Sequence, residues 1–305
     1  MSFEIKRLGL IISPTIQSNV SSNINGPCCI KLPDWCDNRL GTFYLYFSDH
    51  LGDSIKLAYS EHIVGPWSIF EGGVLNLSKY KDAYDHVASP DIFIDHQNER
   101  LILYFHARAK SKGREQWTFA AISQNGTDFL KIIDKPLAPF YLRVIFFEGY
   151  FYGISKGGNI WRSIDGLTKF EPGGNIFDED SVKDLWKNEP GSIRHVALSR
   201  KEKNLHIFYS KIGDAPERIL KGNVSLNNCD WIDWKMENEK EVLKPETLFE
   251  GAALPLINSR SGPSLRPENG LRDPYILQHE SKNYLFYTVS GEQGIAVCEL
   301  GSLEP

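Results

Sequence analysis

Cysteine is scarce in this chain and poorly placed for disulfide bonds. The 305 residues include five cysteines, an odd number, and Cys28 and Cys29 are adjacent. This pattern does not indicate a disulfide framework. No two cysteines have the two-residue separation found in most structural zinc sites. We therefore expect no metal ion, and no motif indicates a cofactor.

Clusters of positive charge and long hydrophobic runs are also missing. The 34 Lys and Arg residues are scattered among 39 Asp and Glu residues, whereas nucleic-acid binding needs clustered basic residues. No apolar run approaches the roughly 18 residues of a membrane span. The run Leu8–Ile12 is too short for the apolar region of a signal peptide, which takes about 7–15 residues. We expect a cytoplasmic protein with no nucleic-acid or membrane partner, and no pattern indicates its oligomeric state.

The sequence is rich in short strands that end on a polar residue. In one copy, the apolar residues 92–94 and 101–105 flank a polar turn, which is typical of an antiparallel hairpin. The residues that end the second strand of each hairpin lie 58, 49, 55 and 78 positions apart. This spacing is close to the roughly 40–50 residues of a four-stranded propeller blade. The five second strands are Phe43–Ser48, Leu101–His106, Tyr150–Ser155, Leu205–Ser210 and Tyr284–Thr288.

This repeat predicts an all-β fold, a five-bladed β-propeller with four-stranded antiparallel blades around a central opening. A β-sandwich is the alternative, but a sandwich does not need a repeated aromatic strand. We expect residues 1–305 to form a single domain. Residues 1–24 lead in and could supply a strand, Leu10–Ile12, that closes the ring. Residues 241–271 form a long loop rich in proline and glycine, and long ordered loops are usually functional.

The hairpin topology predicts where a site would lie. The first strand of each blade leaves one face of the ring and the second returns to it, so the start of one and the end of the other share that face. We expect the linker to bring Glu250 to the same face, near Asp273. The other polar residues expected there are Asp49, His50, His86, Ser89, Asp91, His106, Arg108, Arg143, Arg194, His195, Arg272, Asp273 and Glu292.

This residue set suits hydrolysis of a glycosidic bond. One carboxyl group donates a proton to the leaving oxygen, and another activates water or attacks the sugar. Arginine and histidine bind sugar hydroxyls and keep one acid ionised. A structural role stands beside the functional one for each residue, because Asp91 and Asp273 also suit turns next to a proline. The histidines, taken singly, also suit hydrogen-bonded structural positions.

The strings Tyr-Leu-Tyr-Phe-Ser-Asp-His (44–50), Gly-Pro-Trp (65–67), Ala-Ser-Pro-Asp-Ile-Phe-Ile-Asp (88–95) and Arg-Asp-Pro (272–274) carry a family resemblance. Over about residues 25–300 the chain resembles the five-bladed propeller glycoside hydrolases. In these strings the chain is most similar to families 43 and 117, and families 32 and 68 are more distant. The resemblance implies a sugar-acting protein with its site at the central opening.

The chain departs from the family 43 pattern at two positions. That family has a base aspartate where this chain has Asn25, and an acid glutamate opening the third blade, where Glu148 falls in a hairpin turn. Asp91 does match the second aspartate of the pattern. Family 117 uses aspartates with a histidine as acid, so the resemblance implies roles for Asp91, His106 and Asp273.

The sequence therefore predicts a hydrolase acting on a small oligosaccharide. Asp273 or Asp91 would be the base, and His106 or Glu250 the acid. The remaining polar residues of that face would bind substrate. A carbohydrate-binding propeller that has lost its catalytic acids is the alternative. A metal-dependent variant would need a closer ligand spacing than the sequence has.

Overall fold

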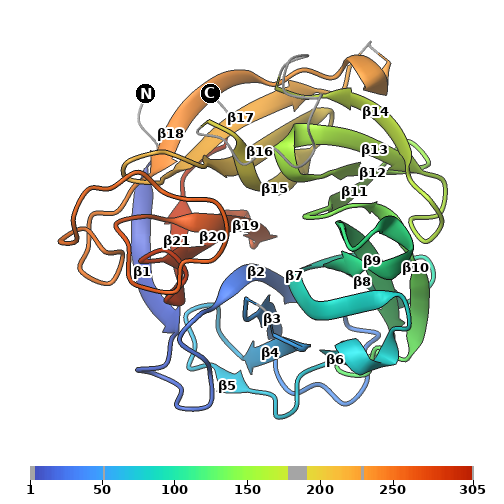
Figure 1. The fold of residues 1–305 in the computed structure, drawn as a ribbon, viewed down its shortest axis with the longest axis horizontal. Coiled ribbons are helices and arrows are strands. Elements are labelled where there is room, and N and C mark those ends of the chain that lie inside the picture. Colours follow the sequence, from blue (N-terminus) through green and yellow to red (C-terminus); the bar gives the residue numbers. More distant parts are fainter. Residues whose placement is uncertain (1–3, 51, 178–190, 228–229, 304–305) are drawn as a thin grey trace.

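The chain forms five antiparallel sheets around a common axis (Figure 1). This computed structural model describes residues 4–50, 52–177, 191–227 and 230–303. The sheets follow one another along the chain as blades of a propeller, and the first strand of each lies innermost. The prediction of five four-stranded blades is confirmed. In the first blade the outermost strand is in two pieces, β5 and β6, and both pair with β4.

The strands have the following bounds. The first blade contains β2 (Asn25–Lys31), β3 (Phe43–Ser48), β4 (Ser54–Ser60), β5 (Ser68–Ile69) and β6 (Leu75–Asn76). The second contains β7 (Ala83–Asp95), β8 (Arg100–Ala109), β9 (Gln116–Ser123) and β10 (Lys131–Pro139). The third contains β11 (Arg143–Phe147), β12 (Tyr150–Ile154), β13 (Asn159–Ser163) and β14 (Glu171–Asn175). The fourth contains β15 (Ile193–Lys201), β16 (Asn204–Lys211), β17 (Ile219–Ser225) and β18 (Glu237–Leu243).

The fifth blade joins the two ends of the described chain. It contains β19 (Arg272–His279), β20 (Lys282–Val289) and β21 (Gly294–Leu300), and its outermost strand is β1 (Ile5–Ile12). β1 runs antiparallel to β21, with Ile5 opposite Leu300 and Ile12 opposite Ile295. The pairing covers an edge of β21 that would otherwise be open to another chain. Short 3₁₀ turns are η1 (Leu77–Lys79), η2 (Lys110–Lys112), η3 (Lys156–Gly158) and η5 (Trp231–Asp233).

The repeated aromatic strands form the cores between blades. Every residue of β3 is buried, because both faces of the strand contact neighbouring blades. Tyr46 in β3 donates a hydrogen bond of 2.8 Å to the carbonyl of Gly126, in the β9–β10 turn of the next blade. Tyr104 in β8 repeats this contact with Gly166 in the third blade at 2.9 Å. The recurring tyrosine therefore links consecutive blades through a glycine turn.

Four of the five innermost strands contain a β-bulge at the same level. The register against the second strand shifts between Asn25 and Cys28, Ala88 and Asp91, Ile193 and Val196, and Arg272 and Tyr275. Each shift places one extra residue on the inner strand and turns the side chains there. The innermost strand of the third blade, β11, pairs without a shift.

Three of these bulges share a local sequence. Gly26, Ser89 and Asp273 adopt left-handed φ angles of 58°, 49° and 50°. A proline, which has no N–H to leave unpaired, follows each of them. The backbone strain of a left-handed serine or aspartate is tolerated where the surrounding structure holds it, often at a functional site. Among the described residues, no helix is long and apolar enough to cross a membrane.

Candidate functional site

The bulged residues of four blades meet at the centre of one face. Ser89 Oγ lies 3.3 Å from His195 Nε2, and His195 Nδ1 pairs with Asp273 Oδ1. The amide of Gly26 donates to Asp273 Oδ2 at 3.2 Å. Ser89, His195 and Asp273 are 7, 4 and 0 % exposed. We call Gly26, Ser89, His195 and Asp273 the central cluster.

Electrostatics fixes the protonation of the central cluster. Burial acts to raise the pKa of Asp273, but His195, Arg194 and the Gly26 amide outweigh it and hold that pKa below its usual range. Burial lowers the pKa of His195 despite the opposing effect of Asp273. We therefore assign an ionised Asp273 and a neutral His195 whose Nδ1–H donates to the carboxylate. The Nε2 atom of this tautomer is an acceptor directed at the Ser89 hydroxyl.

A row of rings extends from His195 across the same face. The Tyr141 ring lies against His195 at 3.8 Å between centroids, and His106 lies 4.6 Å from Tyr141. The ring of His86 is 5.4 Å from that of His106. Burial holds the pKa of His106 well below its usual value, and the neighbouring histidines act in the same direction. His106 is therefore neutral near pH 7, which makes it a poor proton donor for the acid role predicted from the sequence.

The outer end of this row is a polar group on the second blade. His86 Nδ1 contacts Asp85 Oδ1 at 2.5 Å, and Arg108 pairs with Asp85 at 3.2 Å. The Arg108 side chain is about half exposed. The structure thus places His86 and Arg108 near His106, with Asp85 as their partner.

Below the central cluster, the axis is filled by Arg143. Its Nη1 contacts the carbonyl of Pro90 at 2.5 Å and Asp91 at 3.3 Å, and its Nε donates to the carbonyl of Val196. The guanidinium also lies over the ring of Tyr275 at 5.5 Å. Side chains from two other blades and the Val196 carbonyl of a third therefore surround the Arg143 guanidinium at this level.

Asp91 lies within the same plug. It is buried, and its second oxygen accepts a hydrogen bond of 3.0 Å from the amide of Val144. Burial raises its pKa, although Arg143 and the Val144 amide oppose the shift. Asp91 therefore contacts Arg143 and the Val144 amide, whereas Asp273 contacts His195 and the Gly26 amide in the central cluster.

Two predicted binding residues, Arg194 and Arg272, are paired with buried carboxylates. Arg194 Nε and Arg272 Nε contact the two oxygens of Glu217 at 2.8 and 2.9 Å. Arg272 also pairs with Glu292 at 3.4 Å and with Glu268 at 2.6 Å. We call Arg194, Glu217, Arg272 and Glu292 the arginine–glutamate network. Its two arginines balance its two glutamates in charge, and the Arg272–Glu217 pair joins the fifth blade to the fourth.

Glu292 connects this network to the first blade. Its Oε2 atom lies 2.8 Å from Asn23 Nδ2 and 3.0 Å from His50 Nδ1. Burial acts to raise the pKa of Glu292, but the hydrogen bond and charge of His50 hold it below its usual value. Asp49, beside His50, lies at the rim and accepts a hydrogen bond of 2.7 Å from Ser21.

The loop expected over residues 241–271 begins only after β18 ends at Leu243, and it divides into two parts. Its second part lies against the arginine–glutamate network, since Arg194 donates to the carbonyl of Arg260 at 2.6 Å and Ser264 N donates to Glu292 at 3.2 Å. Its first part holds Glu250, which is fully buried and contacts Arg7 at 2.9 Å and Tyr287 at 2.8 Å.

Glu250 is therefore withdrawn as a candidate acid. The amides of Glu246 and Thr247 also donate to it, at 2.9 and 3.0 Å. Among the described residues its partners come from β1, β20 and its own loop, and none belongs to the central cluster. Sequence alone did not show this, because the partner arginine lies at the other end of the chain.

Replacing Glu250 by Gln is expected to destabilise the fold and leave activity per folded molecule unchanged. A charged acceptor of several hydrogen bonds is lost, which costs about 2–3 kcal/mol of unfolding free energy. Glu246→Gln removes a half-exposed partner of the same Arg7, so it is a matched control with an expected cost below about 1 kcal/mol. Denaturant unfolding measures both. Loss of turnover at unchanged stability would restore Glu250 as an acid.

Sequence reasoning missed three residues that shape the site: Gly26, Tyr141 and Glu217. Gly26 had a detectable signal, because Gly26-Pro27, Ser89-Pro90 and Asp273-Pro274 occupy the same place in three inner strands. A Cβ on Gly26 would lie 2.7 Å from the Ser89 Cα, so the close approach of these strands requires glycine there. Tyr141 and Glu217 lie in connecting segments and carried no such signal.

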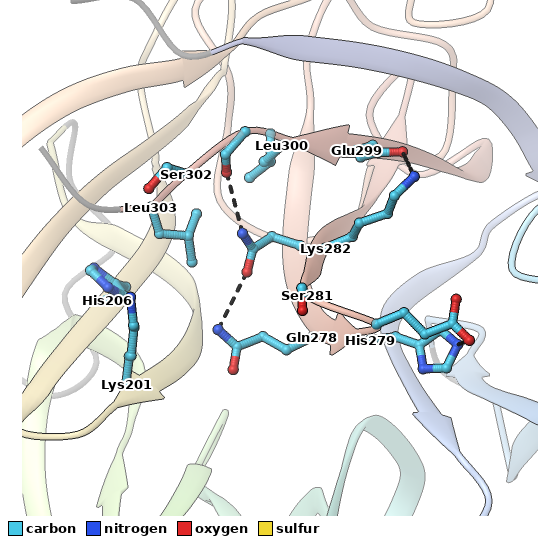
Figure 2. A pocket seen from close by; sticks show the side chains of 13 residues that line it. Lys201, His206, Gln278, His279, Ser281, Lys282, Glu299, Leu300, Ser302 and Leu303 are labelled. Carbon is cyan, nitrogen blue, oxygen red and sulfur yellow. Dashed lines mark hydrogen bonds and ion pairs between the residues drawn. The ribbon is translucent and has the colours of Figure 1, made fainter.

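A pocket of about 730 Å³ lies at the opposite ends of the strands (Figure 2). It is lined by the β19–β20 turn, with Gln278 and Lys282, and by the ends of β15 and β21. Lys282 pairs with Glu299 at 3.1 Å, and Gln278 bonds Asn283 at 3.3 Å. The pocket is therefore a groove between polar turns. Across the described residues, no three His, Cys, Asp or Glu side chains are grouped to hold a metal ion.

Comparison with known proteins gives a sequence relative and several solved structures. No protein-family model matches the chain. The uncharacterized protein R118 of Acanthamoeba polyphaga mimivirus is 38% identical over 299 residues, which cover 91% of this chain and 83% of that protein. At this identity and coverage, the chain belongs to the same family as R118.

The solved structures share the propeller fold. One is CoXyl43, a GH43 β-xylosidase/α-arabinofuranosidase from a compost microbial metagenome, in complex with xylotriose. It is 14% identical, with 98% of this chain and 96% of that chain covered and a TM-score of 0.64. Another is the GH43_1 enzyme of Xanthomonas citri complexed with xylotriose, at 13% identity, 98% and 90% coverage and a TM-score of 0.61. At these identities the likeness concerns the fold alone.

Proposed function

We propose that this member of the R118 family is a carbohydrate-active hydrolase that binds a small oligosaccharide over the central cluster. The observation that carries the proposal is the convergence of Ser89, His195 and Asp273 from bulges in three blades. Buried polar groups brought together in this way must offset a desolvation cost, which function justifies more often than stability does. Propellers of the same fold are glycoside hydrolases, and two of them hold xylotriose.

In this proposal Asp273 is the ionised group of the site. Its carboxylate is held by the imidazole of His195 and the amide of Gly26. The partly exposed ring of Tyr141, packed against His195, supplies a flat apolar surface beside it, on which a sugar ring stacks. The rim residues Asp49 and Arg108 would contact substrate hydroxyls.

Carbohydrate binding without cleavage of a glycosidic bond is the second candidate function. A glycosidase needs two carboxyl groups flanking the bond. Within the described part of the chain, no second carboxylate shares a hydrogen bond with Ser89, His195 or Asp273. Glu217 and Glu292 belong to the arginine–glutamate network, and both pair with arginine side chains there.

Calorimetric titration with xylo-oligosaccharides and other small oligosaccharides tests the proposal. We expect saturable binding of at least one of them by the wild-type protein, and weaker binding by Asp273→Asn. A Gln278→Ala variant, altered in the pocket of Figure 2, is the matched control and should bind as the wild type does. Binding that is lost in Gln278→Ala and retained in Asp273→Asn would place the sugar at the wrong end of the propeller. If none of these oligosaccharides binds to the wild-type protein, the proposed function is wrong.

A further inference from the structure

The central cluster has the order of groups that activates a serine nucleophile. Ser89 Oγ lies 3.3 Å from His195 Nε2, and His195 Nδ1 pairs with Asp273. In serine hydrolases the imidazole takes the hydroxyl proton, and the carboxylate holds the imidazole in the correct tautomer. The neutral His195 assigned above has its acceptor nitrogen on the serine side, as this role requires. Three side chains from three separate blades thus form one hydrogen-bonded series.

The backbone holds Ser89 in a fixed and strained position. Its φ angle is +49°, in the left-handed region that a serine seldom adopts. The amide of Ser89 donates to Ser48 Oγ at 3.0 Å, and Gly26 packs directly against its Cα. The following proline fixes the next φ angle. Strain of this kind persists where it orients a functional group.

A buried donor contacts the residue that follows this serine. Arg143 Nη1 contacts the carbonyl of Pro90, the residue that follows Ser89. The other terminal nitrogen, Nη2, is buried and has no hydrogen-bond partner among the residues that the structure describes. An unpaired N–H of a buried guanidinium is costly to keep, and such a donor suits an oxygen that becomes negative during a reaction.

We propose that Ser89 is a nucleophile and that the central cluster hydrolyses acyl esters of sugar hydroxyl groups. The proposal takes the carbohydrate class from the proposed function, and it changes the bond that is cleaved. Ester hydrolysis needs one serine, one imidazole and one carboxylate, which are present, whereas a glycosidase needs a second carboxyl group. It therefore accounts for a site in which Asp273 is the one carboxylate that, among the described residues, bonds within the central cluster.

The reaction balances with water as the only co-substrate. Ser89 Oγ attacks the acyl carbon while its proton passes to His195 Nε2. The tetrahedral intermediate, its oxygen facing Arg143, collapses; the sugar oxygen leaves and takes the proton from Nε2. Water then attacks the acyl-serine and gives a proton to Nε2. Collapse of this second intermediate releases the carboxylic acid and returns the proton to Ser89.

Hydrolysis of 4-nitrophenyl acetate and of fully O-acetylated methyl xyloside tests the proposal. The Ser89→Ala variant is expected to lose about 10³-fold or more in kcat/KM on both esters. It should still bind the oligosaccharide that the wild type binds, so failure of the ester activity and failure of sugar binding are distinguished. Ser225→Ala, at an exposed serine that ends β17, is the control and should keep wild-type rates. Ester hydrolysis that is absent in the wild type, or unchanged in Ser89→Ala, overturns the proposal.

Two further measurements do not depend on the folding of a variant. Wild-type protein treated with diisopropyl fluorophosphate should gain one adduct, located by peptide mass spectrometry at Ser89. Labelling of other serines alone overturns the proposal. The ester rate should rise with pH through a pKa below the ordinary 6.5 or so of histidine and stay level above it, because the neutral imidazole is the base. His195 faces Asp273, Ser89, Tyr141, Arg143 and Arg194, and burial lowers its pKa against the pull of Asp273.

Discussion

An Asp273→Asn protein is expected to fold normally and to lose about 10²- to 10⁴-fold in turnover. Asparagine keeps the size of the side chain and is well tolerated at the φ of +50° found here, because Asn is enriched in the left-handed region. The change removes the negative charge that holds His195 in its reactive tautomer. It also removes the only carboxylate of the central cluster. Measuring both turnover and thermal unfolding of the variant separates a loss of activity from a loss of folding.

The pH dependence of stability provides a second readout for this variant. The folded-state pKa of Asp273 is below its usual value. Its ionised form therefore stabilises the fold at any pH above about 4, and this contribution disappears as pH falls toward the folded pKa. The wild type should lose stability on acidification more steeply than Asp273→Asn. Full turnover in the variant would contradict a role for Asp273 in the reaction.

Replacing Arg272 by Met is expected to lower the free energy of unfolding by about 3–5 kcal/mol. Arg272 is 1 % exposed and contacts Glu217, Glu268 and Glu292. Without it, two carboxylates remain buried with fewer partners, and that cost exceeds any gain from the apolar methionine. Equilibrium unfolding in urea measures the change.

An exposed arginine provides the comparison for Arg272. Arg200, at the end of β15, contacts the carbonyl of Glu202 and is exposed to solvent. We expect Arg200→Met to change the unfolding free energy by less than about 0.5 kcal/mol. Equal effects of the two substitutions would show that the arginine–glutamate network does not stabilise the fold.

The fold could be predicted because the sequence repeats. The second strand of a blade packs between two neighbouring blades, which favours apolar and aromatic residues on both of its faces. The same kind of aromatic run therefore recurs in all five blades. The run Phe43–Ser48 is buried throughout, as its composition indicates. The tyrosine at the position of Tyr46 recurs for a second reason, since its hydroxyl bonds the glycine turn of the next blade. Because each blade packs against its neighbours in the same way, the sequence repeats with the period of a blade.

The site could be predicted only in part, because its contacts cross between blades. The topology argument indicated one face for Ser89, His195 and Asp273, and the structure brings these three into contact. It did not distinguish side chains that face the opening from those held by another blade. The bulges add one residue to each inner strand, so strict alternation no longer gives the direction of a side chain.

Glu250 and Arg272 show the remaining difficulty. Both are charged residues that the topology argument assigned to the expected face, and both are held by partners that no local pattern indicates. Arg7 binds Glu250 from the far end of the chain, and Glu217 binds Arg272 from the preceding blade. From the sequence alone, such a charged residue looks functional. The structure shows its oppositely charged partner and thereby its structural role.

The pairing of β1 with β21 also sets an order of events during synthesis. Ribosomes deliver Ile5 long before Leu300, its partner in the fifth blade. Blades made early can fold while the rest is translated, but β1 must wait with an open edge until almost the whole chain has emerged. Joining such distant segments is slow, because a long loop must close before the contact forms. We therefore expect the nascent chain to be most prone to aggregation just before β21 is made, and to depend on chaperones at that stage.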